Sequence, residues 1–258
     1  MVRAAPLIED HLRNFIGGYR QSRSREYLLT IRLVHDLGVA AAACGYELLV
    51  YLPTVDCDGF DVIFDDRKRL VAMQLKSRVA RGGTAGWKIR RSLLRPRPEE
   101  ADLFGPEFSG GAAGRGGGVI LTTATAVGET VDVTYSYTDM VVLSALWSNI
   151  VERKNAERLR LSRLRCELAS TDSGSVEIPR SPFLKAGSPI QLLALAGLQS
   201  NINSEWRTHM LELLRHEHQK ARLSTPVKVL RQKISVALDG LGPNEPAAIR
   251  SARNVAEL

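Results

Sequence analysis

The amino-acid sequence predicts an α/β (α+β) fold, in which helices flank a mixed β-sheet core and an α-helical C-terminal extension follows. Two observations carry this prediction. A helical repeat precedes a run of strand-like segments, and beyond residue 171 no convincing strand pattern occurs while helical repeats continue. We therefore divide the chain into a first domain of residues 1–170 and a helical C-terminal region of residues 171–258.

The first element is a helix expected over residues 24–44. When it is wound at about 100° per residue, Leu29, Leu33 and Leu37 fall on one broad apolar arc, which also contains Tyr27, Ile31 and Val34. Glu26 lies inside this arc. A carboxylate on an inward face costs desolvation free energy unless a partner compensates it. Glu26 is therefore either a functional group or a residue that only favours the helix dipole in the first turn or extends out to solvent at the helix end.

Strands and further helices follow in order. Strands are expected over residues 46–52, 58–64, 70–77, 119–123 and 131–138, with a hairpin turn at residues 65–68. A short basic helix is expected over residues 87–94, and a long helix over residues 139–169, capped by Asp139. In the C-terminal region, helices are expected over residues 188–198, 204–222, 226–239 and 245–257.

The overall composition restricts the class of protein. The chain has 258 residues, 44% of them hydrophobic, and no apolar run approaches the roughly 20 residues that a membrane-spanning helix needs. The N-terminus lacks the apolar segment of a secretory signal, and an odd count of three cysteines fits a reducing compartment. We therefore expect a cytoplasmic protein without a membrane partner.

The charges favour a polyanionic partner, with nucleic acid as the first candidate and an anionic membrane surface as the second. The formal net charge is +7. Five acids between Asp56 and Asp66 precede eleven basic residues between Arg67 and Pro98, a stretch that contains no acid. Acids hold a cation and bases hold phosphates, so this order of charges suits a metal-dependent phosphodiester enzyme.

Three polar side chains converge on the predicted hairpin. Side chains alternate along a strand, so a turn at residues 65–68 places Asp61 roughly opposite Gln74, with Lys76 just beyond on the same face. A lysine in an otherwise apolar strand needs a partner. A structural ion pair between Asp61 and Lys76 is one explanation, but it accounts for neither Gln74 nor Glu26.

These residues resemble the motifs of the PD-(D/E)XK nuclease superfamily. Glu26 on a first helix, Gly59-Phe60-Asp61 on a strand and Gln74-Leu75-Lys76 on the next strand are similar to its QxK branch, found among Mrr-like restriction enzymes. The resemblance covers about residues 20–140. It implies a restriction-endonuclease-like core and a metal-dependent DNA endonuclease that acts in restriction or anti-phage defence. Glutamine replaces the usual acid. Its amide oxygen can bind a cation but brings no charge to the metal.

The resemblance and the chemistry of the residues suggest a role for each. Mg²⁺, for which Mn²⁺ can substitute, prefers oxygen ligands. Asp61 is the expected primary ligand, joined by the side-chain oxygen of Gln74 and the carbonyl of Leu75. Glu26 would bind a second ion or a metal-bound water, and Lys76 would stabilise the attacking hydroxide and the developing phosphate charge. Asp58 is an alternative to Asp61.

The basic segment after Lys76 is the expected substrate track. Phosphate contacts are predicted for Arg78, Arg81, Lys88, Arg90 and Arg91, and Trp87 is expected to stack on a base or to wedge between bases. The alternative is that Trp87 belongs to the core and the arginines are merely solvated.

DNA is the expected partner, with RNA as an alternative, and we expect a homodimer. Two rival functions stay open: an inactive nuclease fold that only binds nucleic acid, and an effector controlled by a regulatory protein partner.

Overall fold

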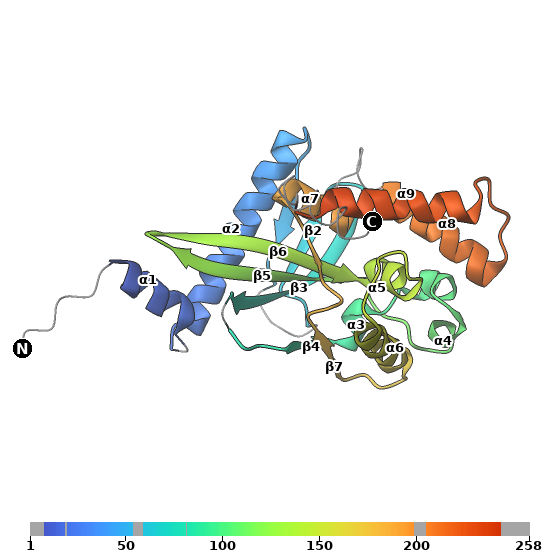
Figure 1. The fold of residues 1–258 in the computed structure, drawn as a ribbon, viewed down its shortest axis with the longest axis horizontal. Helices are drawn as coiled ribbons and strands as arrows, with labels where there is room; N and C mark the ends of the chain where they lie inside the picture. The colour runs from blue at the N-terminus through green and yellow to red at the C-terminus, as the bar shows by residue number, and fades with distance from the viewer. Residues whose placement is uncertain (1–7, 19, 54–58, 81, 199–204, 244–258) are drawn as a thin grey trace, which may run out of the picture.

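The structure is a computed structural model that describes residues 8–18, 20–53, 59–80, 82–198 and 205–243 (Figure 1). Its strands are β1 (Leu49–Tyr51), β2 (Val62–Asp65), β3 (Leu70–Val79), β4 (Gly86–Arg90), β5 (Gly118–Val127), β6 (Thr130–Asp139), β7 (Ser175–Pro179) and β8 (Leu184–Lys185). Its helices are α1 (Ile8–Gly17), α2 (Ser22–Ala43), α3 (Arg91–Leu94), the 3₁₀-helix Pro98–Leu103, α4 (Pro106–Ser109), α5 (Met140–Trp147), α6 (Asn155–Ala169), α7 (Pro189–Ala196), α8 (Glu205–Gln219) and α9 (Val227–Leu241).

The predicted class, a mixed sheet flanked by helices, is confirmed. Six strands form one sheet in the order β1-β2-β3-β5-β6-β8, and β4 pairs with β7 in a second sheet of two strands. Strands β3 and β5 run parallel, whereas the other paired neighbours run antiparallel. In Figure 1 the long helix α2 lies against the large sheet, and α8 and α9 lie together at the other end of the molecule. In the described part of the chain, no helix has the length and apolar character needed to cross a bilayer.

The hairpin between β2 and β3 has the predicted turn. The last pair of the ladder joins Asp65 to Leu70. Within the turn, Asp65 Oδ1 accepts a hydrogen bond from the Arg67 backbone N–H at 2.8 Å, and Asp66 Oδ1 accepts from the N–H of Arg69 at 2.6 Å. Aspartates that bond the backbone two or three residues onward stabilise tight turns. This local chemistry sets the register of both strands.

Helix α2 is present where the sequence predicts it, but its buried stripe is narrower. Leu29, Leu33 and Leu37 are buried, whereas Tyr27 is 67% exposed and Ile31 is 47% exposed. The expectation of one broad inward arc is therefore wrong at these two positions, and Glu26 is exposed as well. Periodicity gives the direction of the apolar face, but its width depends on how much of the helix the sheet covers.

The segment after residue 86 is a strand where a basic helix was expected. Trp87 and Ile89 are buried while Lys88 and Arg90 are exposed, which is the period of two of a strand. The partner of β4 is β7, paired from Gly86 with Pro179 to Arg90 with Ser175. Helix α3 covers only the last four residues of the expected helix. A strand whose partner lies almost 90 residues away gives little local signal.

The long helix expected over residues 139–169 is two helices. Asp139 caps α5 as predicted, because its side chain accepts a hydrogen bond from the N–H of Val142 at 2.8 Å. Helix α5 ends at Trp147, and Asn149 adopts a φ of +56°, a left-handed conformation that no helix interior accepts. Helix α6 then starts at Asn155.

The C-terminal region contains strands as well as helices. Helices α7, α8 and α9 match three of the predicted segments, and residues 245–257 lie outside the described residues. The expectation of no strand after residue 171 is wrong, because β7 pairs with β4 and β8 pairs with β6. The core also continues across residue 170: Leu168, Leu193 and Ile234 belong to one buried cluster with Leu33 and Phe64. The division of the chain into two domains stays a prediction.

A buried charge pair fixes α8 to the end of β6. Arg207, which is 6% exposed, donates a hydrogen bond through Nη2 to Oδ2 of Asp139, which is 3% exposed. The hydroxyl of Tyr137 donates to the same carboxylate oxygen at 3.0 Å, and Nη1 of Arg207 donates to the carbonyl of Leu195 at 2.7 Å. The network therefore joins β6, α5, α7 and α8.

Candidate active site

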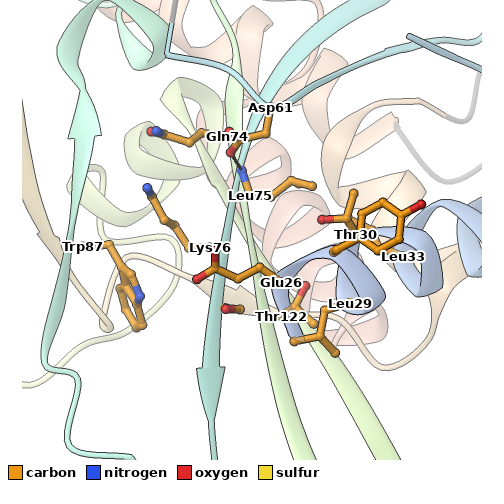
Figure 2. A pocket seen from close by; sticks show the side chains of 12 residues that line it. Glu26, Leu29, Thr30, Leu33, Asp61, Gln74, Leu75, Lys76, Trp87 and Thr122 are labelled. Carbon is orange, nitrogen blue, oxygen red and sulfur yellow. Dashed lines mark hydrogen bonds between the residues drawn. The ribbon is translucent and has the colours of Figure 1, made fainter. Parts of the chain in front are cut away.

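A pocket of about 430 Å³ opens beside β3 and contains the predicted site residues (Figure 2). Side chains from α2, the start of β2, β3, β4 and β5 meet here, although they are spread over almost 100 positions of the sequence. The lining residues are Glu26, Tyr27, Leu29, Thr30, Leu33, Asp61, Gln74, Leu75, Lys76, Ser77, Trp87 and Thr122. Glu26, Asp61, Gln74, Leu75 and Lys76 are thus brought together, as the sequence predicts.

Asp61 stands where β2 begins, and its side chain replaces part of the strand ladder. Its N–H donates to the carbonyl of Met73 at 2.8 Å, and its Oδ2 accepts from the N–H of Leu75 at 2.6 Å. At the end of the ladder away from the turn, Val62 pairs with Met73, so continuing the register by one residue sets Asp61 opposite Gln74. Beyond this point the described residues give β3 no partner on the β2 side, and this edge opens into the pocket.

The backbone before Asp61 requires a glycine. Gly59 has a φ of +75°, a conformation that residues with a Cβ rarely adopt. A Cβ at this position would also lie 2.1 Å from Cγ of Arg90. The side chain of Arg90 therefore packs directly over the residue two positions before Asp61. Asp58, the alternative ligand, lies outside the described residues, and the choice between the two aspartates stays open.

Gln74 has an unsatisfied polar atom that fits the site of a cation. Its Oε1 is buried and has no hydrogen-bond partner. A buried polar atom without a partner costs about 1–3 kcal/mol. Strand alternation directs Gln74 and Lys76 to the same face of β3, and Lys76 is half-buried. A cation held by the amide oxygen would remove the cost of leaving this atom unpaired.

Glu26 reaches the pocket from α2, across the sheet edge from Lys76. Figure 2 shows Glu26, Asp61 and Lys76 arranged around the same opening. The carboxylate of Glu26 is exposed and needs no buried partner, so the argument from the desolvation cost of a buried carboxylate does not apply to Glu26. Its position in the pocket keeps it among the candidate site residues for a different reason, namely its closeness to the other three.

The pocket offers two carboxylates and two neutral oxygens to a cation. Among the described residues, no three His, Cys, Asp or Glu side chains lie together in the manner of a metal centre. The oxygen atoms that could hold a cation here are those of Asp61 and Glu26, the side-chain oxygen of Gln74 and the carbonyl of Leu75. Mg²⁺ commonly takes one or two carboxylates and completes its shell with waters and substrate phosphates, so this set fits the ion.

The alternative of a structural ion pair receives no support within the described residues. Their ion pairs do not include one between Asp61 and Lys76. The carboxylate of Asp61 instead accepts a backbone hydrogen bond from Leu75. Lys76 lines the pocket together with Asp61.

The predicted substrate track divides into residues of different kinds. Lys88 and Arg90 are exposed on β4, whereas Nη1 of Arg91 pairs with Oδ2 of Asp172 at 3.1 Å. Trp87 is only 8% exposed and packs edge-on against Phe183, with ring centroids 5.6 Å apart. Most of its ring thus belongs to the core, and its stacking on a base stays a prediction. Arg81 lies outside the described residues.

Arg78 turns back onto its own strand end. Its Nη2 donates to the carbonyl of Ala80 at 2.9 Å. Burial lowers the pKa of the Arg78 guanidinium, and the nearby positive charge of Arg180 lowers it further. Sequence reasoning missed Arg180, and it missed Thr30 and Thr122 in the pocket, because nothing in the local pattern distinguishes these residues from ordinary surface or strand positions.

Comparisons with known proteins identify no relative. No family model matches the chain, and neither a curated protein nor a solved structure matches it.

The two exposed cations of β4 provide a test of the substrate track. Replacing Lys88 and Arg90 with alanine should weaken duplex binding for all sequences alike. The slope of log affinity against log salt should become shallower by up to about two units, because each lost phosphate contact contributes about 0.9. Fluorescence anisotropy over a series of salt concentrations, without divalent cations, measures this slope. An unchanged slope would remove β4 from the substrate path.

Proposed function

We propose that this protein is a metal-dependent DNA endonuclease of the PD-(D/E)XK kind, in its QxK form. The observation that carries the proposal is one pocket that contains Glu26, Asp61, Gln74 and Lys76, in which the buried oxygen of Gln74 has no partner. The proposal is also supported by the element order α2, β1, β2, β3, α3 and β5, a helix, three strands, a helix and a strand, with β4 inserted. A restriction-endonuclease-like core is part of the proposal.

Each side chain has a defined task in this function. Asp61, Gln74 and the carbonyl of Leu75 would hold Mg²⁺, and Glu26 would orient a water or a second ion. The bound ion supplies a nucleophilic water at neutral pH and neutralises phosphate charge. The ammonium of Lys76 donates hydrogen bonds to the phosphoryl oxygen, where negative charge develops as the water attacks. A positioned charge of this kind stabilises the transition state more than the ground state.

The direct test is cleavage. The protein is incubated with supercoiled plasmid, linear duplex, single-stranded DNA and RNA, each with Mg²⁺, with Mn²⁺ and with a chelator. We expect DNA cleavage that depends on the divalent cation and leaves the chelated samples intact. Cleavage of RNA alone would change the substrate class. No cleavage of any substrate, by protein that binds DNA, would favour the rival function of a nuclease fold that has lost catalysis.

The neutral side chain of Gln74 is the feature that favours a nuclease fold without catalysis, because an amide attracts a cation less than a carboxylate does. Replacing Gln74 with glutamate should lower the Mg²⁺ concentration needed for half-maximal cleavage by roughly tenfold, since ligand charge tunes affinity for hard cations. A titration of Mg²⁺ against the cleavage rate measures the change. A variant that requires the same or more Mg²⁺ would show that Gln74 does not face the cation.

The quaternary structure and the cellular role are also part of the proposal. We propose a cytoplasmic homodimer that acts in restriction or anti-phage defence, under the control of a partner protein or of the DNA itself. Leu193, Leu214 and Ile234 of the C-terminal helices are buried within one chain, so they do not provide the dimer surface. Leu28 (51% exposed) and Val39 (57% exposed) on the outer side of α2 are apolar residues left uncovered.

A two-fold dimer is the commonest closed oligomer and would present two sites for double-strand cutting. Light scattering coupled to size exclusion at micromolar protein should therefore give twice the chain mass. Replacing Leu28 and Val39 with glutamate should return the particle to the mass of one chain if α2 forms the contact. A wild-type chain that elutes strictly as a monomer, with and without duplex DNA, would contradict the dimer.

A further inference from the structure

A second hollow lies on the face of the large sheet that carries Lys76. It has a volume of about 560 Å³. Lys76 pairs with Leu121 and Arg78 pairs with Thr123, so strand alternation places these four side chains on one face. The pairing continues through Ser136 of β6 to Lys185 of β8. The hollow, which we call the basic hollow, is lined by Arg78, Ala80, Leu121, Thr123, Thr125, Thr134, Ser136, Arg153, Glu157, Arg180, Ser181, Phe183 and Lys185.

Positive charge dominates the basic hollow. Four cations line it, and the single acid among the lining residues, Glu157, has an oxygen 4.0 Å from Nε of Arg153. Arg180 and Lys185 are exposed side chains. Burial lowers the pKa of the Arg78 guanidinium, and the positive charge of Arg180, which lines the same hollow, lowers it further. A bound anion would relieve this repulsion.

A hydroxyl without a partner lines the same hollow. Oγ of Ser181 is buried, and no described residue forms a hydrogen bond with it. Thr123, Thr134 and Ser136 add further hydroxyl groups along the floor. Guanidinium groups combined with serine and threonine hydroxyls are the usual donors to phosphate oxygens of nucleic acids. The lining therefore has the chemistry of a phosphate site that does not read base sequence.

The basic hollow adjoins the candidate active site. Phe183 lines the hollow and Trp87 lines the active-site pocket, and the two rings are in edge-to-face contact. Along β3, Arg78 follows Lys76 by two residues, which is about 6.6 Å at the usual rise of a strand. A chain that passes Lys76 can therefore continue directly into the hollow. A concave surface suits such a chain better than it suits a flat lipid headgroup layer.

We propose that the basic hollow binds the sugar–phosphate backbone of the nucleic acid next to the bond that is cut. The hollow is thus a second contact surface, separate from β4, and it holds the backbone through Arg78, Arg180, Lys185 and the hydroxyl of Ser181. The direction of the bound strand, with its scissile phosphate at Lys76, rests on the proposed nuclease function. The binding of a phosphate backbone does not depend on catalysis.

The test compares two pairs of substitutions that remove the same charge. Arg180→Ala with Lys185→Ala removes two exposed cations of the hollow. Lys228→Ala with Lys233→Ala removes two exposed cations of α9, which line neither hollow. Binding of labelled single-stranded and duplex DNA is measured by anisotropy in a chelator, so that no cleavage occurs. The Arg180→Ala and Lys185→Ala protein, the hollow pair, should bind DNA about 30-fold more weakly. Its slope of log affinity against log salt should be shallower by about 1.4–1.8 units, the amount expected for the loss of two phosphate contacts.

The control pair should lose less than about threefold. Equal losses of affinity in both pairs would mean that only overall charge matters, and this would overturn the proposal. Wild-type affinity in the hollow pair would also overturn it, and so would a wild-type protein that binds neither single-stranded nor duplex DNA. Inorganic phosphate at millimolar concentration should compete weakly, because it reproduces only one contact; competition as strong as that of the oligonucleotide would assign the hollow to a small anion instead.

Ser181→Ala gives a test that separates binding from folding. Its hydroxyl has no partner to lose, so the thermal midpoint should stay the same or rise. DNA affinity should nevertheless fall about fivefold, within the range for a typical hydrogen bond. Unchanged affinity in this variant, together with unchanged affinity in the Arg180 and Lys185 pair, would place the backbone elsewhere. Failure of cleavage by the wild type, with these binding results intact, would contradict the nuclease proposal alone.

Discussion

Lys76→Ala should lose DNA cleavage by at least about 10²–10³-fold, the cost of removing one positioned donor to a developing oxyanion. The ammonium lies in the pocket beside Asp61 and Gln74, and no ion pair of the described residues holds it to Asp61. The fold should therefore survive the substitution, and DNA binding in a chelator should fall by no more than one phosphate contact is worth. Single-turnover cleavage and thermal unfolding measure the two effects separately.

A matched control is Lys88→Ala, which removes the same charge from an exposed position on β4. It should leave the single-turnover rate at saturating DNA within about threefold of the wild type, because Lys88 does not line the pocket. Cleavage by Lys76→Ala at the wild-type rate would end the assignment of Lys76. Equal losses in both variants would instead indicate that general electrostatics, rather than a positioned donor, controls the rate.

Asp61 needs a more conservative change than alanine, because its Oδ2 accepts the N–H of Leu75 and so shapes the start of the pocket. Asp61→Asn keeps an acceptor oxygen and removes the charge. We expect it to abolish cleavage while unfolding at the wild-type temperature within a few degrees. If Asp58→Ala is inactive while Asp61→Asn is active, the metal ligand is Asp58.

Arg207→Met should lower the free energy of unfolding by about 3–5 kcal/mol, the range observed when one partner of a buried ion pair is removed. The change leaves Asp139 charged in an interior site where Tyr137 and the Val142 N–H remain its partners. The carbonyl of Leu195 also loses its donor. Because the pair joins β6 to α8, the loss should appear as a shift of the urea midpoint with little change in the slope.

An exposed ion pair serves as the comparison. Glu47 and Arg67 form one at 2.9 Å, with exposed fractions of 65% and 62%. Glu47→Ala should change the free energy of unfolding by less than about 1 kcal/mol, since exposed pairs are screened by water.

A double replacement of Arg207 and Asp139 by apolar residues should recover part of the stability that Arg207→Met loses. An Arg207→Met protein as stable as the wild type would show that the pair does not hold α8.

The sequence by itself determined the elements whose signals are local. The apolar repeat of α2, the cap of Asp139 and the turn aspartates at positions 65 and 66 act through neighbours in the chain, and all are found in the structure. The same turn chemistry sets the register of β2 against β3. For this reason the meeting of Asp61 with Gln74 and Lys76 was predictable: alternation along two strands and one short turn are sufficient to derive it.

Only the tertiary structure decided the features that depend on distant partners. Strand β4 exists because β7, almost 90 residues later, completes its hydrogen bonds, and the sequence around Trp87 alone favoured a helix. The width of the buried stripe on α2, and with it the exposure of Tyr27 and Glu26, depends on how far the sheet extends beneath the helix. The basic hollow joins Arg78 to Arg180 and Lys185 across the sheet order β3-β5-β6-β8. Long-range strand pairing costs chain entropy that no local pattern records, so it becomes visible only when the strands are in place.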